Sequence, residues 1–272
     1  MSASTSPHPP GAPGGTQREP GADPPRVDVL GVRVSATTMA GAVALIARWI
    51  TEGARHYVCV TGVHGVMESQ RDPDLRDIHN RSGLTTTDGL PLVWACHHAG
   101  VAGAERVYGP DLVLAVAERA AAESWRSYFY GGHPGVGEEV AAALAARYAG
   151  FVACGSWSPP FRPLTEAEEE AVARRINDSG ADIVWVGLST PKQERWMAAL
   201  RDRLDAPVLI GVGAAFDIHA GRLRQAPSWM QRRGLEWAFR VAVEPRRLWR
   251  RYAVNNPSFI VRVFRRPPRL VA

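Results

Sequence analysis

Short apolar segments alternate with segments of helical period along most of the chain, and this alternation constrains the fold more than any other feature. Strands are predicted at residues 27–34, 56–61, 126–130, 182–187 and 207–212. Helices are predicted at residues 37–49, 63–80 with a break near Asp72-Pro73, 110–124, from the loop at 131–137 to 148, 165–179 and 191–204. Strands that alternate with helices form a mainly parallel sheet covered by helices on both faces. The sequence therefore predicts an α/β fold.

Polar and glycine-rich segments follow the predicted strands. They comprise Thr61, Asp88 and the segments at residues 131–137, 189–194 and 213–217. Ligands of parallel α/β folds bind beyond the carboxyl ends of the strands. We therefore expect a binding or catalytic site at that edge of the sheet.

The chain divides into three parts by composition. Residues 1–26 contain seven prolines and four glycines, which is typical of a disordered segment. Residues 27–221 form the predicted α/β domain, and residues 1–221 carry 19 basic and 25 acidic residues, a net charge of −6. Residues 222–272 form a basic appendage with 13 arginines and two acids, a net charge of +11. Such an appendage favours a polyanionic partner, such as phosphate groups, nucleic acid or an anionic membrane surface.

Composition also argues against several classes of protein. No apolar stretch approaches the roughly 18–20 residues of a membrane span, and we expect no signal peptide. Cys59, Cys96 and Cys154 are odd in number and scattered, so we expect a reducing cytoplasm and no disulfide framework. The adjacent His97 and His98 would point in different directions on a helix, and the cysteines add no ligand set. We therefore expect no structural zinc.

A glycine-rich loop at residues 131–137 follows a predicted strand and opens a helix, where backbone N–H groups bind phosphate well. Its spacing differs from the G-x-G-x-x-G motif, and Pro134 removes one donor. The loop, which includes Gly132, is either a phosphate-binding turn or a tight turn that needs glycine.

Two later segments have the same position in the pattern. Lys192, the only lysine of the chain, and Gln193 lie in the first turn of a predicted helix, where an anion is favoured. Residues 211–217 end a strand in small residues that let a flat ligand approach near Gly213 and Phe216, and Asp217 could accept from ribose hydroxyls. The alternative for Lys192 and Gln193 is an ordinary polar helix start. The alternative for residues 211–217 is close strand–helix packing with a capping aspartate.

Two further features carry candidate chemistry. Asp88, before Gly89, is either a general base at the end of a strand or a common turn aspartate. In the appendage, Pro245 is predicted to begin a helix with Arg247 and Arg250 on one face, beside aromatic residues suited to a membrane interface. That helix is either a phosphate-binding surface or a solvated basic helix packed through its tryptophans.

Taken together and in this order, these segments resemble the WecG/TagA/CpsF family of bacterial glycosyltransferases. The resemblance covers roughly residues 27–255. It is carried by Thr87-Asp88-Gly89, by RVYGPDL at 106–112, by the loop at 131–137, by GLSTPKQE at 187–194, by GVGAAFD at 211–217, by RQAPSW at 224–229, and by the segment from LEW at 235–237 to EPRR at 244–247.

The resemblance implies a Rossmann-like α/β fold and an arginine-rich helical appendage that completes the site at the membrane. It implies transfer of a sugar from a UDP-sugar, such as UDP-N-acetylmannosamine, its uronic acid or another hexose derivative, to a polyprenyl-diphosphate-linked saccharide. The reaction would invert the anomeric carbon, require no metal or other cofactor, and occur at the cytoplasmic face of the membrane. The implied products are teichoic acid linkage units, enterobacterial common antigen or exopolysaccharide. The oligomeric state is left open, and a homo-oligomer that uses the appendage as an interface is one alternative.

Individual residues are carried over from the family by their position. Asp88 is similar to the general base that deprotonates the acceptor hydroxyl, Thr61 to the polar residue on the preceding strand, and Arg106 to the arginine 18 positions after the base. The other predicted substrate contacts are Gly132, Lys192, Gln193, Gly213, Phe216 and Asp217, with Arg240, Arg247 and Arg250 in the appendage.

The chain departs from the family pattern at one place. Family members often carry Thr-x-Asn on the strand before the aspartate, whereas Thr61 is followed here by Gly62-Val63-His64. Either the register is shifted by a residue or His64 replaces the missing amide.

Two alternative functions make different predictions. A sugar-nucleotide oxidoreductase that uses NAD would have a regular G-x-G-x-x-G early in the domain and an acidic residue about 20 positions later, and neither is present. A nucleic-acid-binding protein would use the basic aromatic appendage. The resemblance favours the glycosyltransferase, with no nucleic acid as partner.

Overall fold

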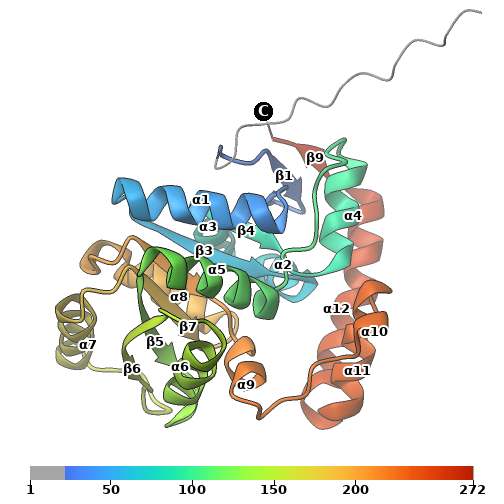
Figure 1. Ribbon diagram of the computed structural model, residues 1–272. Coiled ribbons are helices and arrows are strands. Elements are labelled where there is room, and N and C mark those ends of the chain that lie inside the picture. Colours follow the sequence, from blue (N-terminus) through green and yellow to red (C-terminus); the bar gives the residue numbers. More distant parts are fainter. Residues whose placement is uncertain (1–21, 272) are drawn as a thin grey trace, which may run out of the picture.

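A six-stranded parallel sheet forms the centre of the computed structural model, which describes residues 22–271 (Figure 1). Its strand order is β4-β3-β8-β7-β5-β6. The strands are β3 (His56–Thr61), β4 (Leu84–Thr87), β5 (Arg126–Gly131), β6 (Val152–Trp157), β7 (Ile183–Gly187) and β8 (Val208–Gly211). The predicted Rossmann-like α/β class is confirmed.

Helices cover both faces of this sheet, because alternate residues of each buried strand point to opposite sides. One apolar layer includes Phe129 and Trp185 of the sheet, and the other includes their neighbours Tyr130 and Val186. The first layer is built with α1 (Met39–Glu52), α5 (Gly109–Glu123), α6 (Val136–Arg147) and α9 (Ala215–His219). The second is built with α3 (Pro73–Arg81), α7 (Glu166–Asp178) and α8 (Lys192–Leu200), which the 3₁₀ turn Arg201–Arg203 follows.

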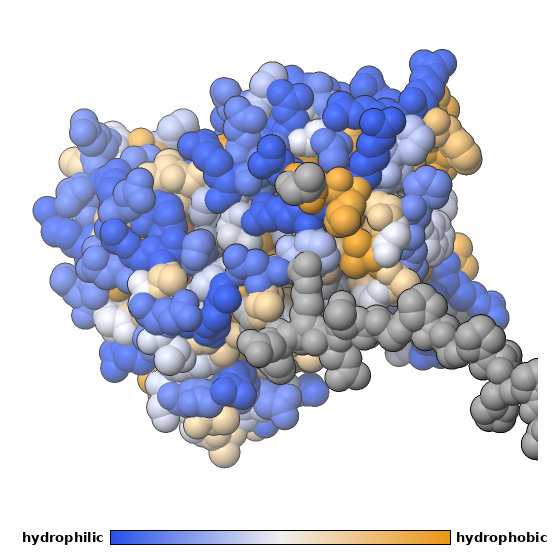
Figure 2. Space-filling model, turned by 90° about the horizontal axis from the view of Figure 1, so that it is seen from above, coloured by the Kyte–Doolittle hydropathy of each residue, from blue (hydrophilic) through white to orange (hydrophobic). Residues whose placement is uncertain are grey.

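Several helix boundaries follow from local sequence signals. Thr38 caps α1 by accepting from the Gly41 N–H, and Gly53 ends the helix in the left-handed conformation at φ 66°. A capping box begins α7, since Thr165 and Glu168 exchange hydrogen bonds with each other's backbone N–H groups. Hydrophilic residues cover most of the face seen from above, and hydrophobic residues are visible near its centre and at its upper right edge (Figure 2).

The single strand expected at residues 27–34 is wrong. The structure has two strands there, β1 (Arg26–Val29) and β2 (Val32–Ser35), paired antiparallel. The turn between them places Leu30 at φ 55° and Gly31 at φ 89°. Two consecutive positive φ angles are the geometry of a two-residue hairpin turn, which reverses the chain. The expected disorder of residues 1–26 lies mostly outside the described residues, and Arg26 already belongs to β1.

The elements that had no counterpart among the predicted helices and strands include β4, β6 and the helix after Gly89. β4 is Thr-rich and fully buried, and β6 is an edge strand with little alternation in burial. The apolar run after Gly89 is the helix α4 (Leu90–His98). These segments lack the clear period of two or of 3.6 residues on which the prediction relies.

The appendage consists of three helices and a short strand that returns to the body. The helices are α10 (Ser228–Arg232), α11 (Glu236–Val243) and α12 (Pro245–Arg265), and the strand is β9 (Arg269–Leu270). The predicted helix start at Pro245 is confirmed. β9 pairs antiparallel with β1, so the end of the described chain joins the small sheet β2-β1-β9 (Figure 1).

A ring of polar side chains fastens α12 to α2 (Val63–Ser69). Arg71 donates to Asn255 Oδ1 at 3.1 Å and pairs with Glu68 at 2.9 Å, while Asn255 Nδ2 lies 3.2 Å from His64 Nδ1. Phe259 of α12 packs with Met67 of α2 in the same apolar cluster. The appendage is therefore attached to the body by specific contacts along α12. Within residues 22–271, none of the helices combines the length and the apolar character needed to cross a bilayer.

Candidate active site

Asp88 lies at the carboxyl edge of the sheet, directly after β4. Neighbouring β3 ends at Thr61, which is in register with Thr87. The Asp88 N–H donates to the Thr61 carbonyl at 3.0 Å. The two residues predicted to carry the chemistry are therefore adjacent at the ends of paired strands.

The carboxyl group of Asp88 is held by one backbone donor and is partly buried. Its Oδ1 accepts from the Gly109 N–H at 3.0 Å, at the start of α5. Burial raises the pKa of Asp88 above its ordinary value, and the negative charge of Glu236 adds to the increase. The positive charges of Arg106 and Arg240 and the Gly109 N–H act in the opposite direction. A partly desolvated carboxylate of this kind is a suitable general base.

Arg106 supports the turn that carries Asp88. Its Nε donates to the Asp88 carbonyl at 2.6 Å, and its guanidinium lies 4.0 Å from the centroid of the Tyr108 ring. A terminal nitrogen of Arg106 forms an ion pair with Glu236, the first residue of α11. Glu236 was not among the predicted site residues. Glu236 is one of two acidic residues in the arginine-rich appendage and lies in the LEW segment that carries the resemblance, but spacing does not link it to a partner 130 positions away.

The side chains of Thr61 and His64 make different contacts. The Thr61 hydroxyl donates to the Cys59 carbonyl at 3.3 Å within its own strand, and Thr61 is 2% exposed. His64 contacts Asn255 in the ring that fastens α12. In this structure Thr61 meets Asp88 through its backbone, and His64 contributes to docking of the appendage.

The loop at residues 131–137 is shaped by close backbone contact with β7. The Gly132 N–H donates to the Gly187 carbonyl at 2.9 Å. A side chain on Gly131 would approach the Gly187 backbone to 2.8 Å, so this position requires glycine. The ring of Phe216 packs on Gly132 and Gly187 and lies 5.9 Å from the Phe129 ring, with Phe216 2% exposed. Phe216, predicted as a substrate contact, thus fills the core beneath this loop.

Gln193 is buried at the start of α8, beside the carboxyl end of β8. A side chain on Gly213 would approach its Oε1 to 3.3 Å, and its Nε2 donates to Glu194 Oε1 at 3.2 Å. In the described part of the chain, Gln193 Oε1 and Glu194 Oε2 have no hydrogen-bond partner. Burial also raises the pKa of Glu194. Gln193 and Gly213 therefore adjoin one another at the site edge, with polar atoms available there.

The remaining predicted contacts are spread more widely. Lys192 is exposed at the first position of α8, and Asp217 is partly buried in α9. In the appendage, Arg240 is close enough to Asp88 to lower its pKa, whereas Arg250 is exposed on α12. The Arg247 side chain lies outside the described part of the structure. The structure thus brings Asp88, Thr61, Arg106 and Arg240 together.

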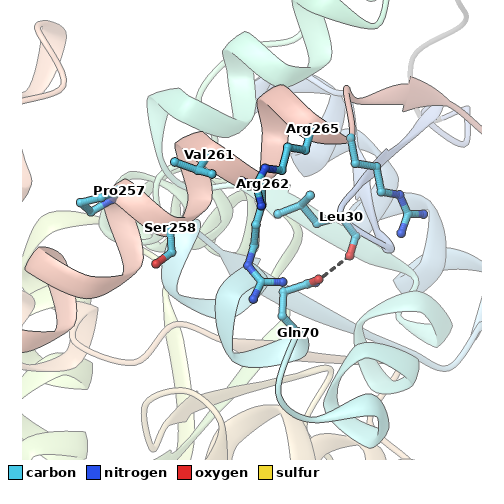
Figure 3. A pocket seen from close by; sticks show the side chains of 8 residues that line it. Leu30, Gln70, Pro257, Ser258, Val261, Arg262 and Arg265 are labelled. Atoms are coloured by element: carbon cyan, nitrogen blue, oxygen red, sulfur yellow. Dashed lines mark hydrogen bonds between the residues drawn. The ribbon is translucent and has the colours of Figure 1, made fainter.

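A basic groove of about 660 Å³ lies at the C-terminal end of α12 (Figure 3). Arg262, Arg265 and Arg266 line it together with Leu30 and Gln70. Gln70 donates to the Leu30 carbonyl at 2.6 Å and so ties the hairpin turn to α2. The groove is separate from the residues around Asp88, and it places three of the appendage's arginines on one open surface.

Across the residues that the structure describes, no group of three or more His, Cys, Asp or Glu side chains is arranged to hold a metal ion. The three cysteines are free thiols. Burial raises the pKa of Cys96 to about 11, which keeps it protonated at neutral pH.

Comparison with known families identifies the chain. The family described as "Glycosyl transferase WecG/TagA/CpsF family" matches residues 27–270. The chain belongs to this family. The match extends through the α/β body and the appendage to β9, so both parts are features of the family. The suspected resemblance is confirmed.

Membership of the WecG/TagA/CpsF family establishes the class of the protein. The family comprises glycosyltransferases that act in cell-surface polysaccharide synthesis. It implies, in general terms, a sugar-nucleotide donor and a lipid-linked acceptor.

Proposed function

We propose that this glycosyltransferase moves a sugar, N-acetylmannosamine or another hexose derivative, from a UDP-sugar to a polyprenyl-diphosphate-linked saccharide, with inversion of the anomeric carbon. The observation that carries the proposal is the arrangement of Asp88. Its carboxyl group lies at the carboxyl edge of the sheet, held by the Gly109 N–H and flanked by Arg106 and Arg240. A positioned base beside cationic groups is what an inverting sugar transfer needs.

Asp88 acts as the general base in this proposal. As the acceptor hydroxyl attacks the anomeric carbon, its proton passes to the Asp88 carboxylate while the bond from the sugar to the UDP oxygen breaks. Positioned proton transfer contributes about 10²–10⁴-fold to such a rate. The Gly109 N–H fixes the carboxylate through Oδ1, which leaves Oδ2 to accept the proton.

Cationic groups of the appendage stabilise the leaving diphosphate in this proposal. Charge that develops on UDP is stabilised by preorganised donors in a site that excludes water. Arg240 lies near Asp88, on α11, and Arg247 and Arg250 follow on α12. Guanidinium groups bind phosphate oxygens through two parallel hydrogen bonds. We therefore assign the donor and the base to the body and the diphosphate contacts to the appendage.

The appendage also supports a location at the inner surface of the membrane. Exposed apolar side chains on α12 lie among its arginines, with Ile260 53% and Phe264 83% exposed beside Arg262 and Arg265. Amphipathic basic helices with exposed aromatic residues bind anionic membrane surfaces. A peripheral position of this kind would bring the enzyme to its lipid-linked acceptor.

The proposal is tested by incubating the purified protein with a panel of UDP-sugars and short-chain polyprenyl-diphosphate acceptors and measuring released UDP. Acceptor-dependent release with at least one pair is expected, and it should persist with a chelator. No release with any pair counts against the proposed substrates. Release that the chelator abolishes contradicts the proposal that no metal is needed.

A further inference from the structure

Glu236 occupies an unusual place for an acidic residue in the basic appendage. It begins α11 and points at the body, where its carboxylate forms the ion pair with Arg106. The side chains of Arg106 and Glu236 are 18% and 14% exposed. Tyr108 also donates a hydrogen bond to Glu236. Three side chains, two from the body and one from the appendage, therefore form one half-buried cluster.

This cluster is connected to the base through Arg106. The guanidinium donates from Nε to the Asp88 carbonyl at 2.6 Å, and one of its terminal nitrogens donates to Glu236. The guanidinium plane rests on the Tyr108 ring at 4.0 Å. Gly109, whose N–H holds the Asp88 carboxylate, is the next residue after Tyr108. Contacts on both sides of Asp88 therefore depend on residues that Glu236 holds.

We infer that Glu236 is a positioning residue that couples docking of the appendage to the placement of the catalytic base. With α11 docked, the Glu236 carboxylate fixes Arg106 and Tyr108, and these fix the turn that carries Asp88. With α11 undocked, Arg106 loses its partner and the turn loses its support. The inference rests on the proposed function only in calling Asp88 the base.

The geometry also separates the roles of the arginines. Arg106 donates from Nε to a backbone carbonyl and from one terminal nitrogen to Glu236, so two of its five N–H donors hold the turn and the appendage. Among the appendage arginines whose side chains the structure describes, none donates a hydrogen bond to Asp88. Misplacement of a catalytic group by about 1 Å costs up to about a hundredfold in rate, so loss of Glu236 should act on turnover more than on donor binding.

The test uses the full chain and the variant Glu236→Gln, which keeps the size of the side chain and removes its charge. The matched control is Glu123→Gln, because Glu123 forms an ion pair with Arg119 on the exposed side of α5. Steady-state kinetics with a UDP-sugar and a polyprenyl-diphosphate acceptor in detergent micelles give kcat and KM. Hydrogen exchange in residues 85–89 and 236–243 reports on the turn and on α11 without requiring activity.

Glu236→Gln is expected to lower kcat about tenfold or more with the donor KM within about twofold, and to increase exchange in both segments. The control is expected to change neither. An unchanged kcat, or faster exchange in residues 236–243 alone, overturns the inference. If Glu236→Gln lowers the melting temperature sharply, Tyr108→Phe provides the second variant. Tyr108→Phe is expected to lower kcat by less than Glu236→Gln does, and the double variant should lose no more kcat than Glu236→Gln alone. A wild-type protein without transfer activity refutes the proposed function, and the exchange result then still decides the coupling.

Discussion

Replacing Asp88 by Asn separates a catalytic role from a structural one. Asn retains an oxygen that can accept from the Gly109 N–H, and the backbone contacts of residue 88 with Thr61 and Arg106 do not involve its side chain. The variant should therefore fold and bind UDP-sugar with an affinity within about twofold of wild type. It cannot accept the proton of the acceptor hydroxyl, so kcat should fall by about 10²–10⁴-fold, which corresponds to about 3–5 kcal/mol of transition-state stabilisation.

The stability of this variant provides an independent check. Because the folded-state pKa of Asp88 is raised, ionisation of Asp88 destabilises the folded protein at pH values above that pKa. Asn removes the ionisation, so the melting temperature at neutral pH should stay the same or rise. The experiment measures released UDP, calorimetric UDP binding and thermal unfolding for each variant. Asp111→Asn serves as the control, because Asp111 is an exposed residue two positions after Gly109. Wild-type turnover in Asp88→Asn, or an equal loss in Asp111→Asn, would refute the assignment of the base.

Three further predictions concern the pH profile, the core and the appendage. Arg240→Gln removes a positive charge that lowers the pKa of Asp88, so the acid limb of the kcat profile should move to higher pH, and a shift to lower pH contradicts the electrostatics. Gly187→Ala places a carbon 2.5 Å from the Phe216 ring and should destabilise the fold by about 1–3 kcal/mol in urea unfolding; unchanged stability would show that the ring moves freely. Asn255→Leu breaks the ring that joins α12 to α2 and should cost about 1–3 kcal/mol of local stability, visible as faster hydrogen exchange in residues 245–265 but not in the strands of the sheet.

The sequence predicted a parallel sheet and four of its six strands, β3, β5, β7 and β8, because buried strands and amphipathic helices leave periodic patterns. It also placed Asp88 and Thr61 at the carboxyl edge of the sheet, where ligands of parallel sheets gather, and the family resemblance pointed to Asp88 as the candidate base. The hairpin at residues 26–35 was missed because Leu30-Gly31 reverses the chain within an unbroken apolar pattern. A one-dimensional pattern of hydrophobicity does not record such a reversal.

Two features of the site depend on packing between distant segments. Phe216 is predicted beside a ligand from its position after a strand, yet it lies in the core because Gly132 and Gly187 leave space for its ring. Glu236 reaches Arg106 only through the fold of the appendage onto the body. Neither contact is encoded in local spacing, so both required the structure.

Mass spectrometry of the lipid acceptor after incubation with a UDP-sugar tests the central claim most directly. The wild-type protein should increase the mass of a polyprenyl-diphosphate-linked acceptor by one glycosyl residue, whereas Asp88→Asn should leave nearly all acceptor unchanged over the same time. Equal product formation by the two proteins, or no glycosylated lipid from any UDP-sugar with the wild type, would contradict the account.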